Sequence, residues 1–262
     1  MRRIRFTKLL LEPPRGKMQF DADGEVIYGE RDVVDLPKLK VLGLPFWLAG
    51  GYGSPEKVAE ALAAGAAGVQ VGTAFALSDE SDLEMESKRE LLAQVRQATA
   101  KVLTDTLSSP TGFPFKVAQL KNSQTNPDVY ARRERVCDLG FLRESYRTAN
   151  GTVDFRCPAE PEKVYLAKGG NPEMMAGRKC LCNALIANIG MPQLRGEYRE
   201  PTLVTMGNDL TGLGRFLSEG AEVYSARSVV EQLLQGVELE ASCSSRGEWG
   251  GTAFPLESAA VS

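Results

Sequence analysis

The stretch WLAGGYGSPEKVAEALAAGAAGVQVGTAF, residues 47–75, contains two short apolar runs that each end in glycine. The run at 45–49 is typical of a buried parallel strand, and residues 68–72 predict a second one. Between them, Ser-Pro-Glu at 54–56 predicts a helix start, because serine caps the first turn and proline fits the first helical position. Strand, helix and strand in so short a segment predict a βαβ unit with parallel strands.

The glycines at the ends of these two strands predict a binding site. Gly50 and Gly51 follow the first strand, and Gly72 ends the second. The carboxyl ends of parallel strands share one edge of a sheet, which is where such folds bind ligands. Glycine lets backbone N–H groups approach a phosphate, and Thr73 adds a hydroxyl donor. Two interpretations stay open: ordinary tight turns, or a phosphate site like the one after strands 7 and 8 of a (β/α)₈ barrel.

These residues carry a resemblance to a known family. Residues 46–75 resemble the end of the FMN-dependent barrel of the nitronate monooxygenase (2-nitropropane dioxygenase-like) family, whose last strands finish in a similar A-G-G and Q-x-G-T. The neighbouring segments PPRGKMQFDADGEVIYGERDVVDLPKLKVLGLP, SPTGFPFKVAQL and RVCDLGFL extend the resemblance over about residues 13–210. The residues that it implies hold the FMN phosphate or lie beside it are Gly50, Gly51, Tyr52, Gln70, Gly72 and Thr73.

The resemblance also implies a fold class and a domain organisation. The fold class is α/β, as the C-terminal portion of a (β/α)₈ TIM barrel followed by a mostly helical, loop-rich C-terminal extension. Residues 1–12 are predicted to be an unmatched leader, and 13–103 the part of the barrel that holds the FMN phosphate. Residues 104–240 are predicted to be a family-specific extension, and 241–262 a flexible tail.

The chain departs from the family at its amino-terminal end. Family members begin with the strands that hold the isoalloxazine ring, and they usually carry a Gly-Gly-His whose histidine is the proposed catalytic base. Here the corresponding place reads KLLLE, residues 8–12, and the chain contains no histidine. The catalytic residues therefore stay unassigned. The departure predicts an incomplete copy or a subunit whose open edges associate with further copies of the chain or with a partner chain.

Three functions remain open on this evidence. The first is an FMN-dependent oxidoreductase of the nitronate monooxygenase type, which oxidises alkyl nitronates with O₂. The second is a related FMN barrel that reduces enoyl thioesters, since one barrel fold supports many reactions. The third is a non-catalytic half-barrel that needs a partner chain. All except the last imply a small-molecule substrate.

Composition excludes several other classes of protein. The formal net charge is −3, without a long basic tract, so no nucleic-acid partner is predicted. No segment approaches the roughly 18 consecutive apolar residues of a membrane span, and the first residues lack the pattern of a signal peptide. We therefore expect a cytoplasmic protein without a membrane partner.

Four of the five cysteines fall in the predicted extension, at Cys137, Cys157, Cys180 and Cys182. Four thiolates could hold Zn²⁺ or an iron–sulfur cluster and would staple a segment that has little apolar content. The alternative interpretation is that they are reduced, mostly buried thiols.

Further elements follow from local patterns. A hairpin is predicted at 20–32 and a helix near 36–42. Ser81 and Glu84 form a capping-box pattern before a helix that the apolar spacing carries to about residue 102. Residues 179–190 predict a buried helix that Gly190 ends, and a last helix is predicted after residue 228.

Overall fold

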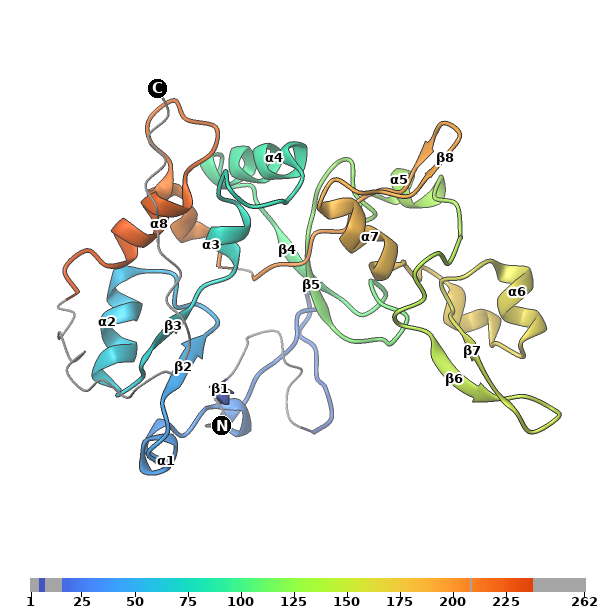
Figure 1. Ribbon diagram of the computed structural model, residues 1–262, viewed down its shortest axis with the longest axis horizontal. Helices are drawn as coiled ribbons and strands as arrows, with labels where there is room; N and C mark the ends of the chain where they lie inside the picture. Colours follow the sequence, from blue (N-terminus) through green and yellow to red (C-terminus); the bar gives the residue numbers. More distant parts are fainter. Residues whose placement is uncertain (1–4, 8–15, 208, 238–262) are drawn as a thin grey trace, which may run out of the picture.

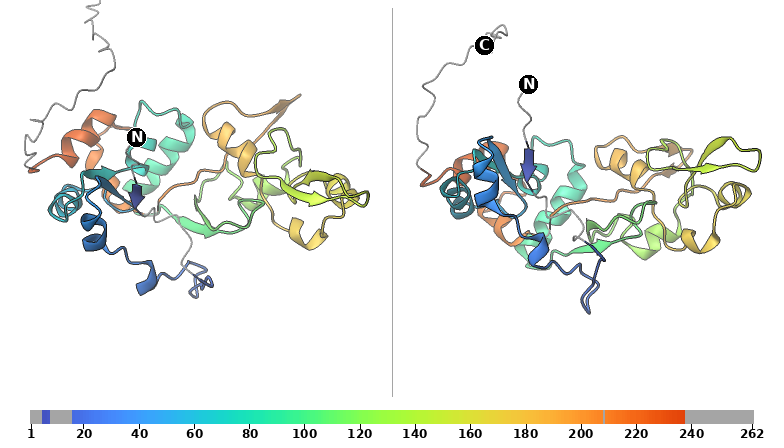
Figure 2. Two further views of the ribbon diagram at one scale, coloured as in Figure 1. Left: turned by 60° about the horizontal axis from the view of Figure 1, so that its bottom comes forward. Right: turned by 90° about the horizontal axis from the view of Figure 1, so that it is seen from below.

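The computed structural model describes residues 5–7, 16–207 and 209–237. The elements lie in two parts side by side, joined by the strands β4 and β5 (Figure 1). One part holds β1 to β3 with α2, α3, α4 and α8, and the other holds α5 to α7 with β6 to β9. The views of Figure 2 show the same separation. The predicted mixed α/β class is confirmed by this arrangement.

The central βαβ unit is as the sequence predicts. β2 (Phe46–Ala49) pairs parallel with β3 (Gly68–Gln70), with Trp47 opposite Gly68, and α2 (Pro55–Ala63) connects them. Ser54 caps α2 by accepting a hydrogen bond from the backbone N–H of Lys57 at 3.3 Å. The side chains that β2 and α2 bury against each other include Phe46, Leu48 and Ala61.

A third parallel strand lies in the segment that the sequence marks as an unmatched leader. β1 (Arg5–Thr7) pairs with β2, with Arg5 opposite Phe46, so the sheet order is β1-β2-β3. Three residues are too few to show a strand pattern in the sequence. Within the described residues this parallel sheet has three strands and does not close into a barrel.

The segment before β2 contains the predicted hairpin and helix. Phe20 and Val26 form an antiparallel bridge, and Gly24 turns the chain with a φ of 81°. The short helices η1 (Glu30–Asp32) and α1 (Leu36–Val41) follow. The predicted helix is confirmed as α1, whereas the hairpin is confirmed only around the bridge between Phe20 and Val26, because the end of its predicted range, 30–32, forms η1.

The helix after β3 differs from the prediction at both ends. The chain forms a short α3 (Thr73–Ala76) and then α4 (Met85–Arg96). The capping box is wrong, because the residue that precedes the helix is Glu84, while the Ser81 hydroxyl donates to the Ala76 carbonyl at 2.6 Å. α4 ends before residue 102, since Ala98 turns the chain with a φ of 53° into the next strand.

The strands β4 (Val102–Asp105) and β5 (Phe115–Ala118) pair antiparallel and connect the two parts. A segment much later in the sequence, 204–206, runs alongside β5. The Ala118 N–H donates to the Val204 carbonyl at 2.9 Å, and the Met206 N–H donates to the Lys116 carbonyl at 3.1 Å. The returning segment therefore brings the end of the chain back to the βαβ unit.

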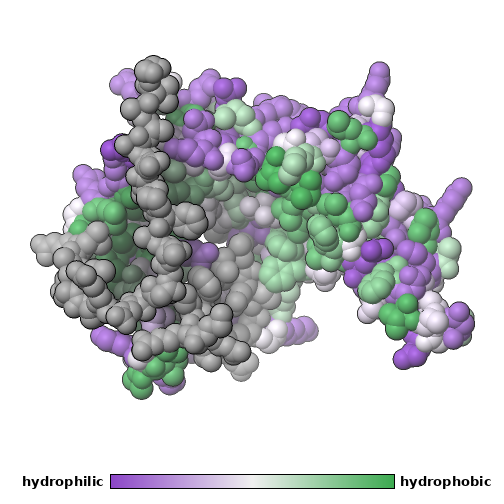
Figure 3. Space-filling model, in the orientation of Figure 1, coloured by the Kyte–Doolittle hydropathy of each residue, from purple (hydrophilic) through white to green (hydrophobic). Residues whose placement is uncertain are grey.

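The second part consists of short elements. In chain order these are α5 (Pro127–Ala131), β6 (Glu144–Arg147), β7 (Val153–Arg156), α6 (Glu162–Ala167), η2 (Pro172–Met175), α7 (Leu181–Asn188), β8 (Leu194–Arg195) and β9 (Tyr198–Arg199). The predicted buried helix is α7, and Gly190 follows it with a φ of 75°. Apolar surface gathers over α7 in Figure 3, where Leu185 and Ile189 are exposed.

A buried ion pair holds this second part together. The Nε of Arg133 lies 2.6 Å from Oε1 of Glu200, and both side chains are almost fully buried. Glu200 also accepts hydrogen bonds from Gln124 and from the hydroxyl of Tyr198. Removing one partner of such a pair would leave an uncompensated buried charge, so the pair fixes how these segments meet.

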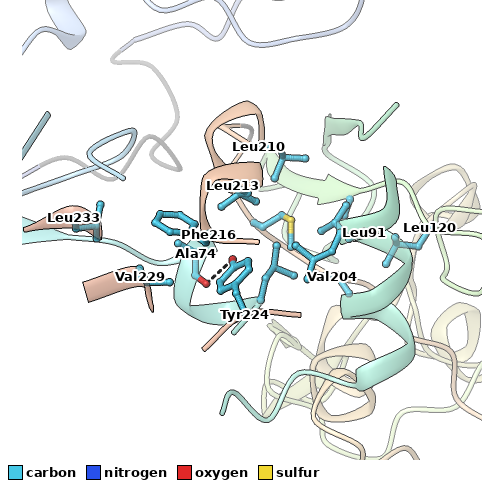
Figure 4. Close-up of a cluster of buried hydrophobic side chains, with 14 of the residues drawn as sticks. Ala74, Leu91, Leu120, Val204, Leu210, Leu213, Phe216, Tyr224, Val229 and Leu233 are labelled. Atoms are coloured by element: carbon cyan, nitrogen blue, oxygen red, sulfur yellow. Dashed lines mark hydrogen bonds between the residues drawn. The ribbon is translucent and has the colours of Figure 1, made fainter. Parts of the chain in front are cut away.

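The main hydrophobic core is shared between the βαβ region and the end of the chain. η3 (Thr211–Phe216) and α8 (Ala226–Leu233), the predicted last helix, pack against α3 and α4 (Figure 4). The buried side chains of this core are Val58, Ala74, Leu77, Leu91, Leu92, Ala118, Leu120, Val204, Met206, Leu210, Leu213, Phe216, Tyr224, Val229 and Leu233. In the described part of the chain, no helix is both long and apolar enough to cross a membrane.

Tyr224 joins this core to α3 by a polar contact. Its hydroxyl donates a hydrogen bond of 2.8 Å to the Ala74 carbonyl, drawn in Figure 4. Burial raises the pKa of Tyr224, so the hydroxyl keeps its proton. We expect Tyr224→Phe to destabilise the protein by about 1–3 kcal/mol in urea unfolding, because the Ala74 carbonyl would be left buried without a donor.

The control is Tyr146→Phe. The hydroxyl of Tyr146 donates to Asp154 on the exposed β6–β7 hairpin, so its loss should change stability by less than about 0.5 kcal/mol. Equal losses for the two variants would show that the contact with Ala74 does not hold α3 in place.

Candidate functional site

The candidate site lies where β2 and β3 end. β2 leads into Gly50 and Gly51, whose φ angles are 85° and 80°. This left-handed conformation favours glycine, because a Cβ atom would strain the backbone there. The turn runs directly into Ser54 and the first turn of α2.

The second glycine turn has a different geometry. Gly72 precedes α3 with a φ of −102°, which any residue can adopt. A Cβ built on Gly72 would meet no heavy atom within 4 Å. The space beside Gly72 is therefore open, and a side chain there would occupy that space without disturbing the fold.

Both turns line a single cavity of about 520 Å³. The residues that line this glycine pocket are Ala49, Gly50, Gly51, Tyr52, Gly53, Ser54, Lys57, Gln70, Val71, Gly72, Thr73, Ala74, Ala76, Thr205, Met206, Gly207, Asp209, Gly212, Leu213 and Arg215. The structure thus brings together every residue that the sequence assigned to FMN binding, Gly50, Gly51, Gln70, Gly72 and Thr73, along with Tyr52.

The second wall of the glycine pocket was missed by the sequence interpretation. It comes from residues 205–207 and 209–215, which belong to the segment predicted to be a separate extension. The backbone N–H of Gly207 donates to Oγ1 of Thr73 at 3.1 Å, a contact between residues 134 apart in sequence. No local pattern signals such a contact.

The Thr73 hydroxyl can still donate a hydrogen bond in this arrangement. A hydroxyl oxygen can accept hydrogen bonds and donate one. Since the oxygen of Thr73 accepts from Gly207, its proton is free to point at a ligand. The hydroxyl is thus positioned as a donor beside the Gly72 turn.

The charges around the glycine pocket favour an anion. Among its described lining residues, Lys57 and Arg215 are basic and one, Asp209, is acidic. Lys57 is engaged with Glu60, since their charged atoms lie 2.6 Å apart. Arg215 has a longer ion-pair distance, 3.9 Å to the exposed carboxylate of Glu56.

The four cysteines do not form the predicted metal site. Cys157, Cys180 and Cys182 are buried in one apolar cluster, and Cys137 is half-buried; all four are free thiols. Among residues 5–7, 16–207 and 209–237, no group of three or more His, Cys, Asp or Glu side chains could hold a metal ion. The prediction of zinc or an iron–sulfur cluster is therefore not supported.

Burial and a mutual hydrogen bond shift the pKa values of these cysteines. Burial raises the pKa of Cys157 to about 11. The Cys180 thiol donates a hydrogen bond to Cys182, which raises the pKa of Cys180 and lowers that of Cys182.

Comparison with known proteins supports the resemblance over part of the chain. Residues 17–109 match the family model described as Nitronate monooxygenase, and this match includes both glycine turns but not residues 205–215. The search of curated proteins gave no match.

Among solved structures, the chain is similar to the enoyl reductase domain of MlnA from the macrolactin biosynthesis cluster from Bacillus amyloliquefaciens. The identity is 16% and the TM-score 0.41, over 73% of this chain. The chain spans about half of that neighbour, 47% of its length.

Proposed function

We propose that the glycine pocket binds FMN and that the protein is an FMN-dependent oxidoreductase of the nitronate monooxygenase type. One observation carries the proposal: two glycine turns at the ends of parallel strands open into one cavity of about 520 Å³. The match of residues 17–109 to the nitronate monooxygenase model supports it.

The residues of the glycine pocket fit a phosphate group. The open space beside Gly72 lets an anion approach the backbone without meeting a Cβ atom. The Thr73 hydroxyl supplies a donor, and successive backbone N–H groups in such turns form anion-binding concavities. Gln70 and Tyr52 lie beside the phosphate in this proposal.

The same proposal assigns the strands to positions in a barrel and the residue ranges to domains. We take β2 and β3 as the last two strands of a (β/α)₈ barrel and residues 13–103 as the part that holds the FMN phosphate. Residues 104–240 form the extension. The boundary between residues 103 and 104 falls inside β4, and side chains of the extension complete the main core. The open edges of the sheet are where we propose that a second chain, either a copy or a different protein, would add strands.

The chain's own contribution to the reaction is binding and orientation. Bound FMN would supply the electron transfer between substrate and O₂. The chain itself has no histidine, so it offers no imidazole of its own to remove a proton from carbon. An alkyl nitronate is already the deprotonated form of a nitroalkane, so its oxidation does not need that step. We therefore propose the nitronate, and not the neutral nitroalkane, as the substrate.

Gly72→Asp tests the phosphate site directly. The backbone conformation at Gly72 accepts any residue and the Cβ meets nothing, so we expect the protein to fold. The added carboxylate would lie beside the phosphate, and we expect the Kd for FMN in flavin fluorescence quenching to rise about 100-fold or more.

The matched control is Gly72→Asn, which has the same size without the charge. Asn should weaken FMN binding less than Asp does, because it lacks the repulsion between like charges. Unchanged FMN affinity in Gly72→Asp would mean that this turn is structural only.

Oxygen uptake tests the proposed activity. The purified full chain with FMN should consume O₂ with an alkyl nitronate and should be slower with the neutral nitroalkane by about 10²-fold or more, because the chain has no imidazole to act as the general base. Equal rates with both would show that another residue serves as the base. If the protein reduces an enoyl thioester with a nicotinamide donor and does not oxidise nitronates, its activity is enoyl thioester reduction and the nitronate proposal is wrong.

A further inference from the structure

We propose that Arg215, supplied by the C-terminal extension, binds the phosphate group of the ligand held by the glycine pocket. This inference rests on the proposed function for the identity of the ligand, and on the pocket itself for its chemistry. Arg215 lines the same cavity as Gly51, Gly72 and Thr73. Residue 215 lies outside the segment that matches the nitronate monooxygenase model, residues 17–109.

The guanidinium of Arg215 is held in place by its own turn. Its Nε donates to the Gly212 carbonyl at 2.9 Å, so the fork of its two terminal nitrogens is oriented. A Cβ atom on Gly212 would come within 3.1 Å of Nη2, so a bulkier residue there would press against the guanidinium. A preorganised arginine fork suits the oxygens of a phosphate, to which it can donate two hydrogen bonds.

The backbone around Arg215 is anchored to the core. Its carbonyl accepts a hydrogen bond of 2.7 Å from Gln232 of α8, and the neighbouring Phe216 is buried in the main core. The arginine therefore has a fixed backbone, and its side chain is only 36% exposed. Holding it still costs less entropy than holding a fully exposed side chain.

The charge of Arg215 is available to a ligand. Among the described residues its nearest carboxylate, on Glu56, lies 3.9 Å away and is 79% exposed, so the contact is too long for a hydrogen bond and is screened by water. Lys57, the other cation of the pocket, already pairs with Glu60 at 2.6 Å. Of these two cations, Arg215 thus has the longer and weaker ion pair.

The test compares FMN with riboflavin, which lacks the phosphate. We expect Arg215→Met to raise the Kd for FMN by about 10- to 100-fold, the range for a hydrogen bond between charged groups, and to leave the Kd for riboflavin unchanged. Arg215→Lys should lose part of the affinity, because it keeps the charge and loses the fork. The control is Arg227→Met, which removes an exposed arginine of α8 that pairs with Glu231 and does not line the pocket.

A second arm separates this inference from the proposed cofactor. Inorganic phosphate and ribose 5-phosphate are titrated into the wild type and Arg215→Met, with the unfolding midpoint as the readout. If these anions stabilise the wild type but not the variant while FMN does not bind, the phosphate site stands and FMN is the wrong ligand. Equal weakening of FMN and riboflavin, or phosphate binding that does not depend on Arg215, would overturn the inference.

Discussion

The packing of η3 and α8 against α3 and α4 is the interaction on which the rest of the structure depends. α3 alone is one turn long and could not hold its position at the end of a three-residue strand. It is held because Ala74 and Leu77 are buried by side chains that the chain supplies much later, among them Phe216 and Val229. The Tyr224 hydroxyl adds a hydrogen bond to the same turn.

This shared core also determines the shape of the glycine pocket. One wall comes from the βαβ unit and the other from residues 205–207 and 209–215, and the hydrogen bond between Gly207 and Thr73 joins them. A ligand that contacts both walls would stabilise their packing, and packing of the second wall would raise the affinity for the ligand by the same free energy. The extension therefore forms part of the lining of the glycine pocket.

The features that could be predicted from the sequence are those set by residues close together in the chain. The βαβ unit and both glycine turns followed from apolar runs, a serine cap and glycine positions, and α7 followed from its apolar pattern and Gly190. The capping box failed because Ser81 bonds to Ala76 instead. The second wall of the pocket, Tyr224 and Arg215 could not be predicted, since their partners are far away in the chain and no periodic pattern marks them.

Hydrogen–deuterium exchange with and without FMN tests the central claim most directly, because it reads both walls of the pocket in one experiment. If FMN occupies the glycine pocket, exchange should slow in peptides that contain residues 50–53, 72–74 and 205–215, and should stay unchanged in the β6–β7 hairpin, which lies away from the pocket. Slower exchange in the two glycine turns without any change at 205–215 would contradict a site built from both walls. No change in the turns would contradict the phosphate site itself.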